Sequence, residues 1–215
     1  MITRNQTIKE IKSMVVVWTF PFVLLAVLVS HRYLDADLAR NILKILNSFS
    51  LLRNGTSNIP DALFLLVCSV STLLWMRYFV LRRQEVTPAA VRFYQVAGTA
   101  VPLAFLLKWV LKFVFGRINT RVWLTNQTSV LNFHWFQGGG NYGGFPSGHM
   151  MVFAAFFTAV WLFNRRYRPH SAAFIMILSI ALIATNYHFL SDVIAGGYAG
   201  FAIAILTNVA LKKNG

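Results

Sequence analysis

Hydrophobic residues are concentrated in six long runs, none of which contains a charged side chain. The runs are 13–30, 62–76, 93–107, 150–164, 171–187 and 193–211. Each has roughly 15 to 19 residues, close to the length that a helix needs to cross the hydrocarbon core of a bilayer. We therefore predict an all-α polytopic membrane protein in which the whole chain, 1–215, forms one domain, a single bundle of six transmembrane helices.

The third run is marginal in length, so we expect its helix to continue through Lys108 and Lys112 to about Phe115. The composition supports a bilayer environment, because 57% hydrophobic and only 12% charged residues is too apolar for an ordinary soluble protein of this size. The first run resembles a secretory signal, but no convincing cleavage site follows it, and we expect it to remain as a helix of the mature protein.

The formal net charge of +14 would suggest nucleic-acid binding in a soluble protein. Here most of the basic residues flank the apolar runs, and we expect no nucleic-acid partner. With six crossings, four basic clusters fall on one side of the membrane, which the positive-inside rule makes cytoplasmic. The clusters consist of Arg4, Lys9, Lys12, Arg77, Arg82, Arg83, Arg92, Arg165, Arg166, Arg168, Lys212 and Lys213. We therefore predict a protein of the bacterial inner membrane with both termini cytoplasmic.

The connections 31–61 and 116–145 fall on the opposite, periplasmic side. The first contains LARNILKILNSFSLL (38–52), whose apolar residues recur at helical spacing. An amphipathic helix lying on the bilayer and a plain ordered loop both fit this segment. Its acidic residues Asp35, Asp37 and Asp61 have no histidine pattern near them, so we predict no metal site in this connection.

Polar groups at membrane depth are costly, so each needs a partner or a function. Lys108 and Lys112 are four residues apart and share one helix face. His188 and Asp192 are also four apart, where the fifth and sixth helices meet. The segment 145–150 begins the fourth helix. The predicted connectivity brings all three groups to the periplasmic face, where they can form one cluster.

The segment FPSGHM (145–150) has the features of an anion-binding helix start. The N-terminus of a helix presents unpaired N–H groups and the positive end of a dipole. We expect Pro146 in the first turn, a hydroxyl donor from Ser147, and close approach of the backbone at Gly148. With basic residues and two histidines nearby, this pattern predicts a phosphate site with phosphoryl-transfer chemistry.

Three segments resemble the motifs of the type 2 phosphatidic acid phosphatase superfamily: LKFVFGR (111–117), FPSGHM and HFLSDVIAG (188–196). The resemblance covers roughly residues 108–197, with the motifs in the family's order. It implies a six-helix membrane enzyme that removes phosphate from a lipid phosphomonoester or pyrophosphate through a phosphohistidine. Candidate substrates are phosphatidic acid, phosphatidylglycerophosphate, a polyprenyl pyrophosphate and the phosphates of lipid A.

Carried over to the matching positions, the resemblance makes His188 the nucleophile and Asp192 the carboxylate that orients it. His149 becomes the acid that protonates the leaving alcohol and then the base that activates water. The phosphate would be held by Lys112, Ser147 and the amide of Gly148. The implied chemistry needs no metal and no cofactor, and the implied partners are a lipid phosphate and the bilayer.

Two arginines of the family pattern are absent, because Asn119 and Leu182 occupy their positions. Arg117 and Arg121 flank Asn119, and either is a candidate for the missing phosphate-binding guanidinium. Lys108 either adds charge to the site or extends its amine to the membrane interface.

Other interpretations stay open at this point. His149 can be a polar helix cap, and His188 with Asp192 can be a structural pair. The phosphohistidine can pass its group to an acceptor lipid, which would make the chain a phosphotransferase. The missing arginines also fit a catalytically silent phospholipid-binding or carrier protein, although the retained histidines and aspartate argue against it. The sequence predicts no oligomeric state.

Overall fold

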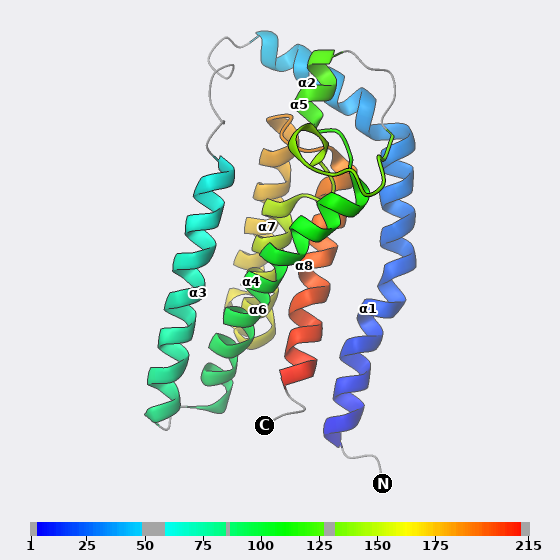
Figure 1. The fold of residues 1–215 in the computed structure, drawn as a ribbon. Helices are drawn as coiled ribbons and strands as arrows, with labels where there is room; N and C mark the ends of the chain where they lie inside the picture. The colour runs from blue at the N-terminus through cyan, green and yellow to red at the C-terminus, as the bar shows by residue number, and fades with distance from the viewer. Residues whose placement is uncertain (1–3, 49–58, 85–86, 127–131, 212–215) are drawn as a thin grey trace.

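The computed structural model describes residues 4–48, 59–84, 87–126 and 132–211. Figure 1 shows a bundle of long helices in which the start of α1 and the end of α8 lie at the same end. The long helices are α1 (Arg4–Val29), α3 (Ile59–Arg83), α4 (Pro88–Phe115), α6 (Gly148–Phe163), α7 (Arg168–Ala184) and α8 (Leu190–Leu211). The basic residues Lys212 and Lys213 lie outside the described residues.

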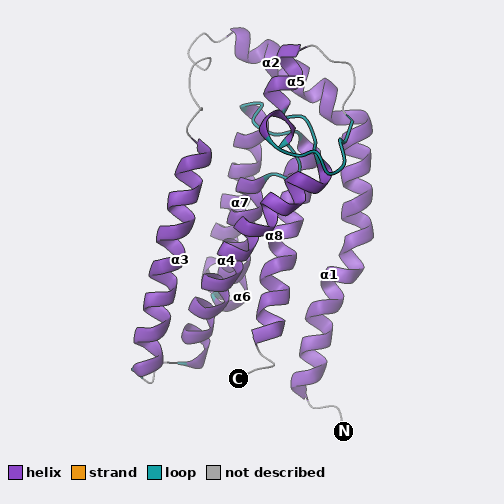
Figure 2. Cartoon of the chain, viewed as in Figure 1, coloured by secondary structure: helices purple, strands orange, loops and turns teal. Residues whose placement is uncertain are grey.

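Two shorter helices cover the opposite end of the bundle, α2 (Asp35–Ser48) and α5 (Thr120–Asn126). A π-helical turn at Ser30–Leu34 joins α1 to α2. Figure 2 shows the loop before α6, residues 132–147, gathered at this same end. The described residues contain no strand, only one isolated antiparallel bridge between Arg117 and Phe133. The all-helical prediction is therefore confirmed for this part of the chain.

Five helical segments of the described chain are long and apolar enough to cross a membrane. They comprise the stretch Ser13–Ser48, α3 from Leu63, α4, the stretch Arg165–Ala184, and α8. The remaining predicted segment is α6, which is apolar but has only 16 residues. At about 1.5 Å per residue it rises roughly 24 Å, less than the hydrocarbon core of roughly 30 Å. The prediction of six spanning helices is thus confirmed for five.

Several helix ends can be compared with the predicted ones. α4 does continue to Phe115, where Gly116 ends it in a left-handed conformation with φ of 52°. The segment predicted as a helix or a loop is helical up to Ser48, and its residues 49–52 lie outside the described residues. α7 ends at Ala184, three residues earlier than predicted. The expected place of Pro146 is wrong, because α6 begins at Gly148 with Ser147 as its N-cap.

α8 lies at the centre of the bundle and contacts α1, α4, α6 and α7. Two of its glycines allow the closest approach. A Cβ atom on Gly196 would collide with the carbonyl oxygen of Ser147, and one on Gly200 would collide with that of Met151. The backbone amide of Ser147 also donates to the carbonyl oxygen of Asp192 at 3.0 Å. These contacts hold the start of α6 against the start of α8.

Candidate active site

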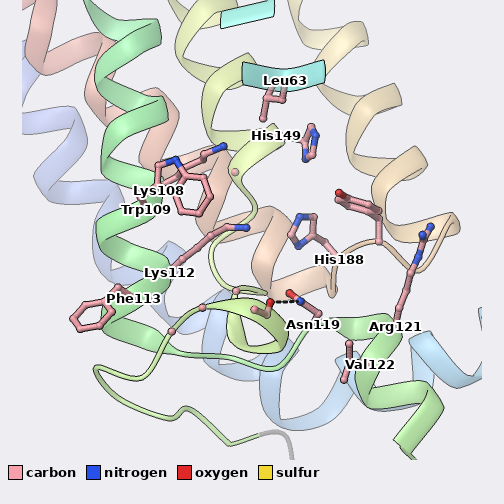
Figure 3. Close-up of a pocket in the computed structure, with 16 residues that line it drawn as sticks. Leu63, Lys108, Trp109, Lys112, Phe113, Asn119, Arg121, Val122, His149 and His188 are labelled. Carbon is pink, nitrogen blue, oxygen red and sulfur yellow. Dashed lines mark hydrogen bonds between the residues drawn. The ribbon is translucent and has the colours of Figure 1, made fainter. Parts of the chain in front are cut away.

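A cavity of about 740 Å³ is lined by the ends of α4, α5 and α6, by the loop 138–143 and by the α7–α8 link. Figure 3 shows His149 and His188 in its middle, with the lysines of α4 on one side and Arg121 on the other. The structure therefore gathers most of the predicted site residues around one space. The lining residues used below are Leu63, Lys108, Trp109, Lys112, Phe113, Asn119, Arg121, Gly148, His149, Tyr187 and His188.

His188 lies in the link between α7 and α8, just before α8 begins at Leu190, and Asp192 lies in the first turn of α8. Asp192 is fully buried, and its Oδ2 lies 3.6 Å from Nδ1 of His188. The same oxygen accepts a hydrogen bond from the backbone N–H of Phe189 at 3.0 Å, as the third residue of a capping box does. Since Nδ1 is directed at the carboxylate, Nε2 is the nitrogen of His188 that a ligand in the cavity can meet.

Burial lowers the pKa of His188 below its ordinary value of 6.5. Asp192 opposes this shift, because its negative charge favours the imidazolium, whereas Lys112 lowers the pKa further. Burial prevails because removing a charged ring from water is costly. The imidazole is therefore neutral at neutral pH, which is the form that a nucleophile needs.

The start of α6 contains three predicted site residues, of which one lies behind the cavity and two line it. The Ser147 hydroxyl accepts from the amide of Met150 at 3.4 Å, and the residue is completely buried. It therefore caps the helix, and it is absent from the cavity wall. Gly148 and His149 do line the cavity. The ring of His149 stands edge-on to Tyr187, with centroids 5.3 Å apart.

Lys108 and Lys112 project from the last turns of α4 into the cavity. A Cβ atom on Gly148 would lie only 2.8 Å from Cδ of Lys108, so the glycine makes room for this side chain. Lys108 is 6% exposed, and its amine lies 3.7 Å from the centre of the Phe105 ring. These contacts keep the amine at the cavity instead of extending it towards the interface.

Arg121 is on the short helix α5, on the opposite side of the cavity from the lysines. Its guanidinium lies 5.2 Å from the centre of the Tyr187 ring and donates to the carbonyl oxygen of Thr185 at 3.3 Å. Cation–π attraction holds a guanidinium next to an aromatic ring, and a guanidinium is suited to bind the oxygens of a phosphate. Of the two arginines that flank Asn119, Arg121 is the one on the cavity wall.

Arg117, a candidate for contact with phosphate in the sequence, lies behind the cavity and is not among the residues that line it. Its guanidinium is completely buried and donates to Asp192 at 2.5 Å, Ser191 at 2.6 Å and Asp35 at 2.7 Å. Two buried carboxylates compete strongly for one cation. These partners engage both terminal nitrogens of the guanidinium.

Within the described residues, no three His, Cys, Asp or Glu side chains lie close enough to hold a metal ion. The groups gathered at the cavity are instead donors and cations: two lysines, an arginine, two histidines and the amide end of α6. Such a set suits the oxygens of a phosphate.

The family model described as "PAP2 superfamily" matches residues 93–215, more than half of the chain. The chain belongs to the PAP2 superfamily. Among curated proteins, a lipid A 1-phosphatase of Rhizobium etli is 32% identical over 117 residues, covering 54% of this chain and 50% of the relative. A lipid A 1-phosphatase of Rhizobium johnstonii is 35% identical over 80 residues, covering 37% and 33%. The chain thus spans half or less of these relatives. No solved structure matches it.

Both departures from the PAP2 superfamily pattern have a visible structural outcome. Asn119 lines the cavity, and its amide donates to the carbonyl oxygen of Gly140 at 3.1 Å. It therefore joins the loop that contains Gly138, Gly139 and Gly140 to the wall of the site. Leu182 is 8% exposed and packs against Met150 and Val193. An apolar contact between α6, α7 and α8 has taken the place of a charged group.

Sequence reasoning in this PAP2 superfamily member missed two functional candidates. Asp35 is buried against Arg117 and Ser191, although it looked like an isolated acid of the first connection. The only signal in the sequence was its charge, since just six acidic residues occur in the chain. Tyr187 contacts the rings of both site histidines, whereas the apolar run 171–187 predicts it only as the last residue of a helix.

Proposed function

We propose that this chain is a membrane lipid phosphatase that hydrolyses a lipid phosphomonoester or pyrophosphate through a phosphohistidine at His188. One observation carries the proposal: two histidines, one of them beside a buried carboxylate, share a cavity with the α4 lysines and Arg121. This arrangement supplies a nucleophile, an acid and a set of cations around one space. Membership of the PAP2 superfamily and the names of its relatives support the same class of reaction.

In the first step, Nε2 of neutral His188 attacks the phosphorus atom. The new P–N bond forms as the P–O bond to the lipid breaks, with its electron pair passing to the lipid oxygen. Protonated His149 gives that oxygen a proton, so the lipid leaves as an alcohol, or as a monophosphate if the substrate is a pyrophosphate. Asp192, next to Nδ1, stabilises the positive charge that the ring gains.

In the second step, His149, now neutral, takes a proton from a water molecule. The water oxygen attacks phosphorus, and the P–N bond breaks with its electron pair returning to Nε2 of His188. Inorganic phosphate leaves, and both histidines are back in their starting states. The cations of the cavity stabilise the negative charge that develops on the phosphoryl oxygens in each transition state.

The phosphate-binding set in this proposal is Lys108, Lys112, Arg121 and the amide of Gly148, all on the cavity wall. Lys112 and Gly148 keep the roles that the family resemblance implied. Arg121 supplies the guanidinium that the family places elsewhere. Ser147 acts indirectly, since its hydroxyl caps the helix that presents Gly148 and His149.

We propose a lipid A-type 1-phosphate as the first substrate to test, because both relatives carry the name lipid A 1-phosphatase. The cavity wall supports a lipid substrate: beside the cations it contains Leu63 and the exposed side chains of Trp109 and Phe113. The phosphate of a lipid can then lie among the cations while the apolar part of the lipid lies against the bilayer. Phosphatidic acid, phosphatidylglycerophosphate and polyprenyl pyrophosphates are the competing substrates.

The membrane orientation belongs to the same proposal. The basic clusters place the start of α1 and the end of α8 in the cytoplasm, and the cavity lies at the other end of the bundle. The site then faces the periplasm, where the phosphate of an outer-leaflet lipid is accessible. Reporter fusions in the α3–α4 link and in the 132–147 loop should report opposite sides of the membrane.

The experiment that tests the activity is phosphate release by the purified chain in detergent or nanodiscs. The panel contains lipid A, phosphatidic acid, phosphatidylglycerophosphate and undecaprenyl pyrophosphate. His188→Ala and His149→Ala should abolish release. His170→Ala is the matched control, because His170 lies exposed at the start of α7. With para-nitrophenyl phosphate, whose leaving group needs no proton, His149→Ala should accumulate the acid-labile phosphohistidine.

Other outcomes assign other functions. Release that survives His188→Ala would contradict the phosphohistidine. Transfer that requires an added acceptor lipid would identify a phosphotransferase. Lipid binding by the folded protein without any transfer would identify a carrier that has kept the site, as the positions of Asn119 and Leu182 would then explain.

A further inference from the structure

Asp35 is a buried carboxylate at the start of α2, and it contacts the residues that support the candidate site. It is 1% exposed. Its Oδ2 accepts hydrogen bonds from Arg117 at 2.7 Å and from the Ser191 hydroxyl at 2.5 Å, and its Oδ1 accepts one from the Ser191 amide at 3.0 Å. The Ser191 amide lies in the first turn of α8, where N–H groups lack helical partners. Asp35 therefore fixes the helix start that carries Asp192.

Arg117 links Asp35 to Asp192. One of its terminal nitrogens donates to Asp35, and the other donates to Asp192 at 2.5 Å. All three side chains are completely buried, so their charges interact in a medium of low dielectric constant. A buried cation between two carboxylates is sensitive to the loss of either one. A change at Asp35 must therefore alter the position of the Asp192 carboxylate and the electrostatic potential around it.

We propose that Asp35 is a positioning residue for the candidate reaction: through Arg117 and the start of α8 it fixes the Asp192 carboxylate against His188. The inference rests on the proposed function, in which His188 is the nucleophile. Asp35 does not line the cavity, so it acts through its neighbours and not on the substrate. It also lies outside residues 93–215, the part of the chain that matches the family.

The charged and titratable groups around Asp35, Arg117 and Asp192 determine the direction in which a change in charge shifts the pKa of His188. Asp35 faces Arg117 and Ser191, and the Nδ1 atom of His31 lies 4.0 Å from it. Asp192 raises the pKa of His188, whereas Lys112 lowers it. The other ionisable side chains on the cavity wall are Lys108 of α4, Arg121 of α5, His149 of α6 and Tyr187 of the α7–α8 link.

The charges of Asp35 and Arg117 should shift the pKa of His188 in opposite directions. Asp35→Asn removes a negative charge and leaves Arg117 wholly on Asp192, so the imidazolium is less stable and the pKa of His188 falls. Arg117→Gln removes a positive charge from Asp192, so the imidazolium is more stable and the pKa rises. We expect shifts of about half a pH unit, smaller than the 1–3 units of a direct charge contact.

The test is a pH titration of the histidine ring signals by NMR in protein labelled with ¹³C at histidine Cε1. The chain has only five histidines, and His188→Gln identifies the signal of His188. Asp37→Asn is the matched control: it removes the same charge from the same helix, but Asp37 has a side chain 78% exposed, paired with Arg40. It should leave the midpoint of His188 unchanged.

Phosphate release is measured on the same variants. Asp35→Asn should lower kcat about tenfold or more with little change in KM, since Asp35 does not touch the cavity, and Asp37→Asn should match the unchanged chain. If Asp35→Asn alone does not fold, the effect of the Asp35 charge is measured by comparing Arg117→Gln with the double variant Asp35→Asn/Arg117→Gln. His188 should titrate at a lower pH in the double variant than in Arg117→Gln.

The two proposals fail in different ways. If removal of Asp35 leaves the midpoint of His188 in place in both backgrounds, or moves it upward, the positioning role is overturned. If the midpoints move as stated while the unchanged chain releases phosphate from no lipid, the link between Asp35 and His188 stands and the proposed phosphatase activity fails.

Discussion

Gly196 of α8 lies directly against the carbonyl oxygen of Ser147, so close that a Cβ atom would overlap it. This contact joins the last residue of HFLSDVIAG to the segment FPSGHM. It also brings the two segments together: the start of α6, which presents His149, is held against the helix that carries Asp192. The distance between the proposed acid and the proposed nucleophile is thus set by a backbone contact.

A first prediction concerns this contact. Gly196→Ala should lower the free energy of unfolding by about 1–3 kcal/mol, because a rigid carbonyl cannot give way to the added methyl group, and it should reduce phosphate release by displacing α6. Gly197→Ala is the control, since its Cβ would meet only the flexible end of Met150 at 3.3 Å. Thermal unfolding in detergent compares the two, and equal melting temperatures would contradict the steric argument.

A second prediction concerns the catalytic groups. His188→Ala should lower kcat roughly 10⁴-fold or more, and Asp192→Asn by about 10²- to 10⁴-fold, because the first removes the nucleophile and the second only its orienting charge. Phosphate release from the best lipid of the panel measures both. A loss as large in His170→Ala, or nearly full activity in Asp192→Asn, would contradict these roles.

A third prediction follows from the lowered pKa of His188. The attacking imidazole must be neutral, so activity is lost as the pH falls through that pKa, and the acid limb of kcat/KM should lie below 6.5. Asp192 raises the pKa, so Asp192→Asn should move this limb to still lower pH. The pH profiles of the unchanged chain and of Asp192→Asn are measured with the same lipid, so that ionisation of the substrate contributes equally to both. An acid limb at or above 6.5 that moves upward in Asp192→Asn would oppose this assignment.

The same depressed pKa affects stability. Below about pH 6.5 the unfolded chain binds a proton at this position before the folded one does. The contribution of neutral His188 to the free energy of unfolding is therefore present above pH 6.5 and is lost as the pH falls. His188→Gln should unfold with a weaker dependence on pH in this range.

A fourth prediction separates the two arginines that flank Asn119. Arg121→Ala should reduce kcat/KM about 10- to 100-fold, because it removes a guanidinium from the cavity. Arg121→Lys should recover only part of the loss, since an amine cannot bind phosphate through two parallel hydrogen bonds. Arg40→Ala is the control: Arg40 is exposed on α2 and lies 5.1 Å from the ring of Trp123. Equal losses in Arg40→Ala and Arg121→Ala would point to a general charge effect.

Local patterns predicted much of this fold. Runs of apolar residues identified the long helices, and the need for hydrocarbon length correctly extended α4 to Phe115. The family membership predicted from three short motifs is confirmed by the family model. These features depend on neighbouring residues or on spacing along the chain, which a sequence displays directly.

The sequence could not show how polar side chains divide between structure and chemistry. The hydroxyl of Ser147 can bind a ligand or cap its own helix, and only the backbone at Met150 decides between them. Arg117 and Arg121 looked equivalent, yet a carboxylate 82 residues away along the chain draws one of them out of the cavity. Such choices depend on long-range partners, and their outcome is visible only in the folded chain.

The buried contact between Asp35 and Arg117 also limits what the part of this protein that matches the family model can do by itself. Residues 93–215 contain the three segments that resemble the family's motifs, but without α1 and α2 Arg117 would face Asp192 with no second carboxylate and α8 would lose a partner at its start. Exchange of the amino-terminal helices between family members should therefore succeed only where the donor brings an acid to this position, and a motif-bearing fragment should not be an autonomous enzyme.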